Sequence, residues 1–339
     1  MKQGTQTWVF KNKPKIISSS AVVGPDEANG PLKDSFDKTF PTLEMEEKSW
    51  EKAEQALLKE AIDLALKKKS ISKGEIDLYI GGDLINQLTI NSFVIRDYSI
   101  PYFGVFGACS TSMEALTLMA ALVDGGYVEK GIAATCSHNC TVEKQFRYPT
   151  EYGSQKPPTA QYTVTGAGAA VVAINGEGPY IECATVGKVN DLGLTDPFNM
   201  GGAMAPAAVD TIIAHLNDMN RKPSDYDLIL TGDLASVGHP IVKDLLQKEN
   251  VPIESTTFKD CGLMIYDLEN QPVNAGGSGA GCSAVVTYGH IMQELKKGNL
   301  KRVLVVATGA LLSPLTYQQG DTIPCIAHAV SIVGRGVKG

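Results

Sequence analysis

The chain contains short, continuously apolar runs that alternate with segments of helical periodicity. The run at residues 303–307 is apolar at every position, which is typical of parallel strands that helices cover on both faces. Between residues 49 and 69, apolar side chains recur every three or four positions and predict one buried face of a helix. A second helix is predicted over residues 206–220, with Pro206 in its first turn. This alternation predicts a layered α/β fold.

Similar strings recur in the same order in the two parts of the chain. In each part, an apolar run ends in Gly-Asp and is followed by a glycine-rich turn and a helix. The paired segments are 77–84 with 227–234, 107–110 with 280–283, 132–135 with 305–308, and 170–174 with 329–333. Because repeats in a constant order indicate duplication, we predict an N-terminal half of residues 1–185 and a C-terminal half of residues 186–339.

Two stretches, residues 139–163 and 187–205, show little periodicity and contain several prolines and glycines. We expect both to be irregular. Loops of this length in a compact domain are usually functional or mobile, and the alternative is a plain surface excursion.

The charge and the length of the apolar runs exclude some kinds of partner and location. A net charge of −7, with no dense patch of Lys and Arg, argues against nucleic acid as the main partner. Apolar runs such as 116–123 fall far short of the roughly 18–20 residues that a transmembrane helix needs. The first residues are polar, without the apolar core of a signal peptide. Seven scattered cysteines predict reduced thiols in a cytosolic compartment.

Cys109 is the candidate reactive residue, because it precedes the apolar helix predicted over residues 115–123. Ser110 or Thr111 can cap that helix, and Glu114 can complete a capping box. The positive end of a helix dipole favours a thiolate, so Cys109 is a candidate nucleophile or the wall of an anion pocket. The alternative is a small buried cysteine.

The surroundings of Cys109 resemble those of known enzymes. The Gly-Ala-Cys-Ser turn at 107–110 resembles the nucleophile elbow of thiolases and ketoacyl synthases. Residues 165–172 resemble the strand that closes the first half of initiating ketoacyl synthases, and Cys325-Ile326 resembles the start of a thiolase glycine loop. The resemblance implies a duplicated thiolase-like fold with five layers, α-β-α-β-α, in proteins that are usually dimers.

A closer resemblance extends over essentially the whole chain. Its strings lie at residues 145–153, 156–161, 193–201 and 323–329, and they resemble the stage V sporulation protein AD family of endospore-forming bacteria. The resemblance implies a subunit of the SpoVA transport complex that binds dipicolinic acid (pyridine-2,6-dicarboxylate), alone or with calcium, during its uptake into spores and its release at germination. It also implies a homodimer that is cytoplasmic and associates peripherally with the spore inner membrane through other SpoVA subunits.

Two catalytic positions of the enzymes are replaced in this chain. The histidine of initiating ketoacyl synthases falls near residues 231–233, which contain no His, and the turn at 275–280 has glycine where their asparagine belongs. We therefore predict a protein that is not an enzyme. An alternative stays open, because Cys109, Cys325 and His328 together can support an acyltransferase or condensing enzyme. His239 is expected only to open a helix, and a structural dimer with a vestigial pocket is the third interpretation.

A ligand with two carboxylates needs hydrogen-bond donors or a cation in its site. The predicted ligand-binding residues are Cys109, Ser110, Asp83, Asp191, Asp196, Asn199 and His328. Because Asp191 and Asp196 repel a dianion, we expect one of them to act through calcium or to bond a protonated group, with a turn or cap role as the alternative. Lys144, Arg147 and Lys156 are alternative charge partners or solvated surface residues. No cofactor or protein-bound metal is predicted, apart from calcium as the salt of the ligand.

Overall fold

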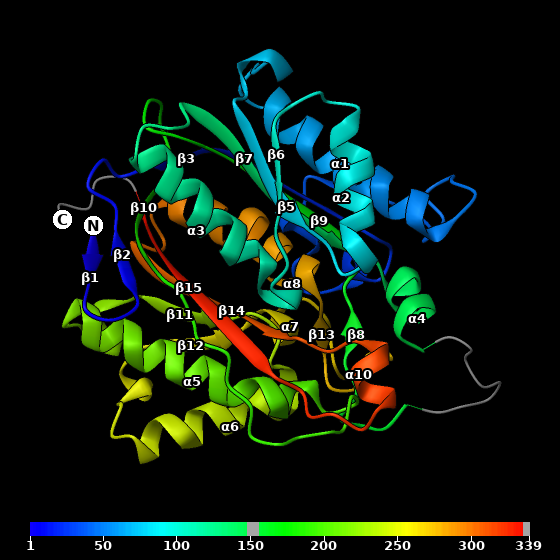
Figure 1. The fold of residues 1–339 in the computed structure, drawn as a ribbon, viewed down its shortest axis with the longest axis vertical. Helices are drawn as coiled ribbons and strands as arrows, with labels where there is room; N and C mark the ends of the chain where they lie inside the picture. The colour runs from blue at the N-terminus through cyan, green and yellow to red at the C-terminus, as the bar shows by residue number, and fades with distance from the viewer. Residues whose placement is uncertain (148–155, 335–339) are drawn as a thin grey trace.

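The computed structural model describes residues 1–147 and 156–334, and its strands form two sets of five that follow the same order (Figure 1). The first set is β6-β5-β7-β9-β3, and the second is β12-β11-β14-β15-β10. The bounds are β3 Lys15–Val23, β5 Leu78–Gly82, β6 Tyr102–Gly104, β7 Lys130–Ser137, β9 Gly166–Ala173, β10 Tyr180–Thr185, β11 Leu228–Thr231, β12 Thr257–Asp260, β14 Arg302–Ala310 and β15 Cys325–Val333.

The pairing within the two sets is also the same. The third strand of each set, β7 or β14, pairs in parallel with β5 or β11, and antiparallel with β9 or β15. The two sets meet at one pairing, between Tyr180 of β10 and Lys15 of β3. This correspondence has the order that the repeated strings predict. The division at residue 185 stays a prediction; β10 pairs along its length with β15 of the second set.

Helices form three layers around the two sheets (Figure 1). α1 (Trp50–Lys67) and α2 (Thr89–Arg96) pack on the outer face of the first sheet, and α5 (Met200–Met219) and α6 (Ala235–Lys248) on that of the second. α3 (Thr111–Asp124) and α8 (Ala280–Val285) lie between the sheets, in the largest apolar cluster. The arrangement is the predicted α-β-α-β-α fold.

Smaller elements complete the chain. They are β1 Lys2–Gln3, β2 Thr7–Val9, β4 Lys38–Thr39, α4 Asn139–Arg147, β8 Tyr162–Thr163, α7 Cys261–Met264, β13 Gly277–Ser278, α9 Met292–Lys297 and α10 Pro314–Gln318. β8 and β13 form a separate parallel pair that joins the first half to the second.

One helix prediction is confirmed, and one predicted helix start and one stretch predicted to be irregular are corrected. α1 matches its periodic segment, and the Ser49 side chain accepts the N-terminal hydrogen bond from the Lys52 N–H. α5 begins at Met200 rather than in the turn of Pro206, because Asn199 caps it and the proline is accommodated inside the helix. The stretch from residue 139 was predicted to be irregular, but it opens with α4. Residues 148–155 of that stretch lie outside the described part of the chain.

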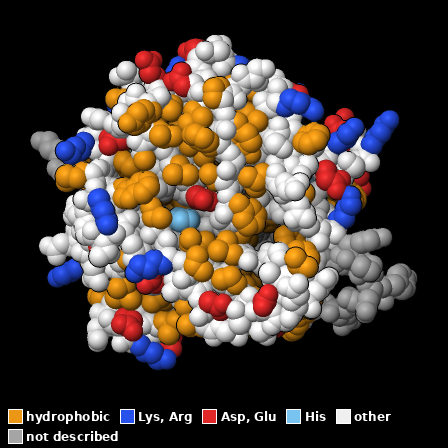
Figure 2. Space-filling model, viewed as in Figure 1, with side chains coloured by type: hydrophobic (Ala, Val, Ile, Leu, Met, Phe, Trp, Pro, Cys, Tyr) orange, Lys and Arg blue, Asp and Glu red, His pale blue; other side chains and the backbone are white. Residues whose placement is uncertain are grey.

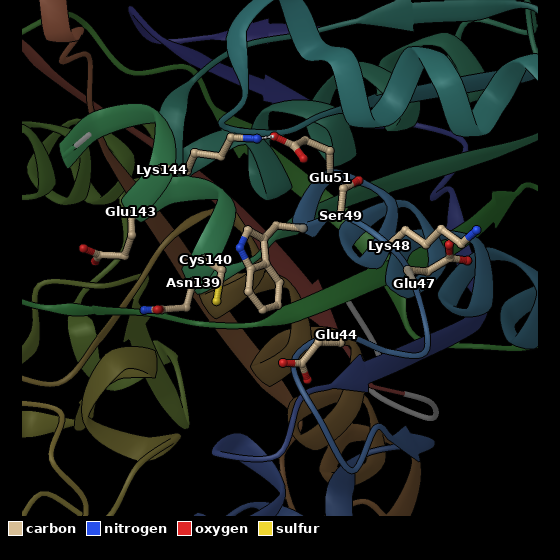
Figure 3. A pocket seen from close by; sticks show the side chains of 10 residues that line it. Glu44, Glu47, Lys48, Ser49, Glu51, Asn139, Cys140, Glu143 and Lys144 are labelled. Carbon is tan, nitrogen blue, oxygen red and sulfur yellow. Dashed lines mark hydrogen bonds and ion pairs between the residues drawn. The ribbon is translucent and has the colours of Figure 1, made fainter. Parts of the chain in front are cut away.

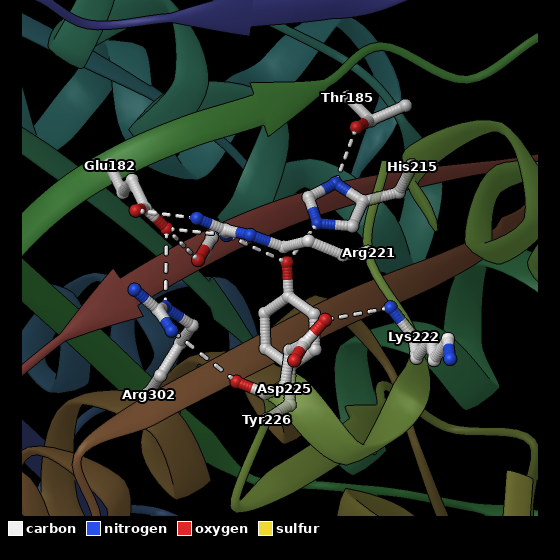
Figure 4. A network of polar contacts seen from close by, with 9 residues as sticks. Glu182, Thr185, His215, Arg221, Lys222, Asp225, Tyr226 and Arg302 are labelled. Atoms are coloured by element: carbon white, nitrogen blue, oxygen red, sulfur yellow. Dashed lines mark hydrogen bonds and ion pairs between the residues drawn. The ribbon is translucent and has the colours of Figure 1, made fainter. Parts of the chain in front are cut away.

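A polar network lies where β14 begins, at the opposite end of this strand from Ala310 (Figure 4). The Arg221 guanidinium donates to both carboxylate oxygens of Glu182, at 2.7 Å each, and to the hydroxyl of Tyr226. Arg302 contacts the same carboxylate at 3.5 Å. These paired charges join the segment that follows α5 to β10 and to the start of β14.

No helix in the described residues is long and apolar enough to cross a bilayer.

Candidate functional site

A cavity of about 420 Å³ lies between the two halves, next to Cys109. Its apolar walls come from Leu84, Phe106, Ala108, Val142, Phe146, Pro197, Phe198, Met200, Ala310, Leu312 and Pro314. Its polar lining comes from Cys109, Glu143, Lys156, Gln161, Thr163, Ser278, Gly279, Ser313 and Tyr317. The walls are thus mainly apolar and partly aromatic, with few polar groups, as in sites for small organic ligands.

Cys109 is held at the cavity by a tight turn before α3. Ala108 has a φ of 51°, a left-handed conformation that is unfavourable for a residue with a Cβ. The Ser110 hydroxyl donates to the Gly107 carbonyl at 2.6 Å. Gly309 of β14 passes so close to this turn that a Cβ there would lie 2.1 Å from the Gly107 carbonyl oxygen. Strand β14 of the second half therefore packs directly against the turn that positions the thiol.

The predicted capping box at α3 is wrong. The Ser110 side chain makes no N-cap bond, and the Thr111 hydroxyl instead donates to the Ala108 carbonyl at 2.7 Å and accepts from the Gly107 N–H. Glu114 Oε2 is buried without a partner among the described residues. Burial raises the pKa of Glu114 to about 7, because the charged carboxylate loses its hydration there.

The Cys109 thiol is buried next to the Asp233 carboxyl group. Burial and the neighbouring Asp233 carboxyl, to which the thiol is hydrogen-bonded, hold the pKa of Cys109 well above its usual range. Desolvation and the neighbouring carboxyl group therefore oppose the thiolate that the helix dipole favours. Burial likewise raises the pKa of Asp233 to about 7, although Thr308 Oγ1 and the Gly279 N–H donate to its carboxylate at 2.7 and 3.0 Å.

The other candidates for acyl transfer do not line the cavity. His328 is 6% exposed on β15, and its Nδ1 accepts a hydrogen bond from the Gly187 N–H at 3.3 Å. Burial lowers the pKa of His328 to about 4 and raises that of Cys325 to about 12, so both side chains are neutral near pH 7. His239 lies inside α6, stacked on Phe258, rather than at the start of the helix as expected.

Two predicted ligand-binding residues beside the cavity point into the protein. The Asp83 carboxylate is fully buried and accepts from the Ile85 N–H, the Asn91 N–H and Asn91 Nδ2. Its neighbour Leu84, rather than Asp83 itself, lines the cavity. Ser110 is fully buried in the turn described above. A role of Asp83 or Ser110 in ligand binding stays a prediction, and their contacts are those of structural residues.

The three predicted residues between the halves make local turn or cap bonds. Asp191 is exposed and accepts from the Gly193 N–H at 2.9 Å, and from the Thr322 hydroxyl. Asp196 accepts from the Phe198 N–H, and Asn199 accepts from the Gly202 N–H as the cap of α5. The cavity is lined instead by residues on either side of Asn199, including Phe198 and Met200. Their ligand-binding roles also stay predictions.

The polar lining contains Lys156, which the sequence offered as an alternative charge partner, and Gln161, which it did not single out. Lys156 Nζ lies 2.7 Å from Glu143 Oε1, and these two are the charged side chains among the described residues that line the cavity. Gln161 is 3% exposed, and its Nε2 donates to the carbonyls of Asp233 and Gly277. Asp233 could have been found from the repeat, since it corresponds to Asp83. No sequence motif around Gln161 identifies it as a site residue.

Lys144, which the sequence also offered as a charge partner, lines a second groove of about 680 Å³ (Figure 3). The Lys144 side chain extends toward Glu51, with Nζ 2.5 Å from Oε1, and Trp50 also lines this groove. Lys144 is therefore not part of the Cys109 cavity. The side chain of Arg147 lies outside the described residues.

Residues 4–333 match the family described as "Stage V sporulation protein AD (SpoVAD)". The chain belongs to the stage V sporulation protein AD family. The Stage V sporulation protein AD of Bacillus subtilis (strain 168) is 55% identical to it over 327 residues, which cover 96% of both chains. The resemblance that the strings at 145–153 and 323–329 indicated is confirmed, and this stage V sporulation protein AD family member is a sporulation protein.

Solved structures with low sequence identity share the fold of this family member. The 3-oxoacyl-[acyl-carrier-protein] synthase III from Aquifex aeolicus VF5 is 14% identical, with a TM-score of 0.59 over 94% of this chain and 99% of that chain. OleA from Xanthomonas campestris, bound to cerulenin, is 13% identical, with a TM-score of 0.61 over 96% of this chain and 100% of that chain. These similarities confirm the thiolase-like fold.

Proposed function

We propose that this protein binds dipicolinic acid in the Cys109 cavity without turning it over, and serves its uptake into developing spores and its release at germination. The ligand is held as the free dicarboxylate or with calcium as its salt. Two kinds of evidence support the proposal: membership in a sporulation family, and a thiolase-like cavity whose cysteine is paired with a carboxyl group.

The lining of the Cys109 cavity is the observation that carries the proposal, and the carboxyl group of Asp233 beside the thiol argues against turnover. Acyl transfer through a cysteine needs a thiolate and a neighbour that removes the proton. Here the neighbour is an acid that opposes thiolate formation. Of the other candidates, His328 is held neutral on β15 and is not among the residues that line the cavity. This chemistry favours ligand binding over the acyltransferase alternative.

The lining of the cavity suits a small aromatic acid. Phe106, Phe146 and Phe198 supply aromatic contact for a flat ring. The hydroxyls of Thr163 and Ser278, on the paired strands β8 and β13, can donate to carboxylate oxygens. A volume of about 420 Å³ has room for one pyridine ring with two carboxylates.

Calorimetric titration with pyridine-2,6-dicarboxylate, with and without calcium, tests the proposal. We expect saturable binding to the wild type and at least tenfold weaker binding to Phe198→Ala, which removes aromatic contact. Cys109→Ala is expected to bind the ligand, because the proposed binding needs no covalent bond to the thiol. Absence of binding to the wild type, or an acyl adduct on Cys109 detected by mass spectrometry after incubation with thioesters, would contradict a non-catalytic binder.

The proposal includes a homodimer. β6 is hydrogen-bonded on one side, to β5, and the exposed aromatic residues Phe93, Phe103 and Phe106 lie in or near it. Figure 2 shows hydrophobic side chains gathered on the face that presents α3 and β15. An exposed apolar edge of this kind is a natural surface for a second copy. Phe103→Lys is expected to yield monomers in light scattering, and a monomeric wild type would contradict the homodimer.

We further propose that other SpoVA subunits hold the dimer at the spore inner membrane. The family membership supports this location. Fractionation of sporulating cells should find the protein with the inner membrane when those subunits are present, and released from it when they are deleted.

A further inference from the structure

We propose that Lys156 recognises a carboxylate of the ligand, and that it does so by exchanging its bond to Glu143 for a bond to that carboxylate. The inference rests on the proposed function, because it names the group in the Cys109 cavity that selects an anionic ligand.

The position of Lys156 supports this role. Its side chain is 29% exposed and that of Glu143 is 22% exposed, so the ion pair lies at the cavity but remains reachable from solvent. Nζ also lies 5.9 Å from the centre of the Tyr162 ring, a second favourable contact for the cation. A lysine on a flexible stem can turn between two acceptors that lie on the same cavity wall.

The other polar groups leave Lys156 as the group that can neutralise a carboxylate. The orientation of the Gln161 carboxamide is set by its Nε2, which donates to two carbonyls. Its Oε1 is therefore an acceptor, buried without a partner among the described residues, and an acceptor repels an anion. The hydroxyls of Thr163 and Ser278 can donate but carry no charge.

The exchange also follows from the charges at the cavity. A carboxylate that enters mainly apolar surroundings must be paired, because an unpaired anion loses its hydration there. Glu143 and the ligand carboxylate then compete for the same ammonium group. A ligand carboxylate inside the cavity is less hydrated than Glu143 at its edge, so the bond to Lys156 is stronger for the ligand.

The test compares four variants by calorimetric titration at low ionic strength: Lys156→Met, Lys156→Arg, Glu143→Gln and Lys144→Met. Lys144→Met is the matched control, since it removes one positive charge from α4, outside the cavity. Each variant is titrated with pyridine-2,6-dicarboxylate and with the uncharged pyridine-2,6-dicarboxamide. Thermal unfolding curves establish that each variant is folded.

Lys156→Met is expected to weaken binding of the dicarboxylate by about 10- to 100-fold, the range for loss of a charge-assisted hydrogen bond. Binding of the diamide should change little. Lys156→Arg should retain most of the affinity, Lys144→Met should match the wild type, and Glu143→Gln should bind the dicarboxylate more tightly because the competitor is gone.

Three results would overturn the inference. Wild-type affinity in Lys156→Met would remove Lys156 from recognition, while leaving binding itself in place. Equal weakening in Glu143→Gln and Lys156→Met would mean that the ion pair is a fixed bridge and that no exchange occurs. A wild type that binds neither compound would refute the proposed function, and the role of Lys156 with it.

Discussion

Asp83 and Asp233 occupy equivalent places in the two halves, just after β5 and β11, yet their carboxylates have different partners. Asp83 is bound by Asn91 and Ile85 of its own half. Asp233 is bound by Thr308 and Gly279 and also meets the thiol of Cys109, which comes from the other half. Duplication thus supplied two similar carboxyl groups, and the packing of one half on the other placed one of them next to the Cys109 thiol.

The two cysteines of the repeat differ in the same way. Cys282, at the start of α8, is fully buried, and its thiol is directed to the Gly232 carbonyl at 3.5 Å. Cys109 is 9% exposed and lines the cavity. The similar Gly-Ala-Cys-Ser and Ala-Gly-Cys-Ser turns therefore lead to one core residue and one site residue. The difference lies in what the turn faces: Cys109 lies at a junction between the halves, where the cavity opens.

The largest expected effect comes from disrupting the packing of Gly309 on the Cys109 turn. Gly309→Val places a Cβ about where the Gly107 carbonyl lies, and neither backbone can move without displacing β14 or the Cys109 turn. We expect the free energy of unfolding to fall by roughly 4 kcal/mol or more, within the range of severe core defects. Urea denaturation checks this. The control Gly74→Ala, with nothing within 4 Å of the added Cβ, should be nearly neutral, and a Gly309→Val protein of wild-type stability would contradict the close packing.

A second prediction concerns how stability depends on pH. Asp233 loses its proton near pH 4 in the unfolded chain but keeps it to about pH 7 in the fold. Between these values the unfolded state binds fewer protons, so the stability that Asp233 contributes falls as pH rises, by on the order of 4 kcal/mol. Denaturation at several pH values should give a flatter profile for Asp233→Asn than for the wild type.

Asp83→Asn serves as the matched comparison. Burial also raises the pKa of Asp83, but three N–H bonds favour its charged form. We therefore expect this variant to flatten the profile less than Asp233→Asn does. Other buried carboxyls with raised pKa values, such as Glu54, stay in all the variants and contribute the same background. Equal profiles for the wild type and Asp233→Asn would mean that Asp233 is not the buried acid described above.

The smallest expected effect concerns the reactivity of the Cys109 thiol. Because the Asp233 carboxyl opposes formation of a Cys109 thiolate, Asp233→Asn should lower the thiol pKa and speed alkylation of Cys109 by iodoacetamide about tenfold at pH 8. Asp83→Asn should leave the rate unchanged. Mass spectrometry of the peptide that contains Cys109 measures the rate. A similar acceleration in both variants would point to general loosening of the fold instead.

Much of the fold could be predicted from the sequence, because it depends on local patterns that recur. The continuous apolar runs become the buried strands, and the repeated strings become equivalent strands in two sets of the same order. The periodic segment from residue 49 becomes α1, with Ser49 as its cap. The prediction failed where a local signal has two possible outcomes: Pro206 suits a helix start, but Asn199, seven residues earlier, caps the helix first.

The sequence by itself determined the architecture, which follows from periodicity and repetition, and the family, which follows from strings such as those at 145–153 and 323–329. The tertiary structure alone decided the state of Cys109 and the composition of the cavity. Lys156 and Gln161 are far along the chain from Ser278 and Ser313, and these residues line one cavity because β8 pairs with β13 and β14 packs on the Cys109 turn. Burial then sets the charges: desolvation and a carboxyl neighbour outweigh the helix dipole, and neither can be read from the residues next to Cys109.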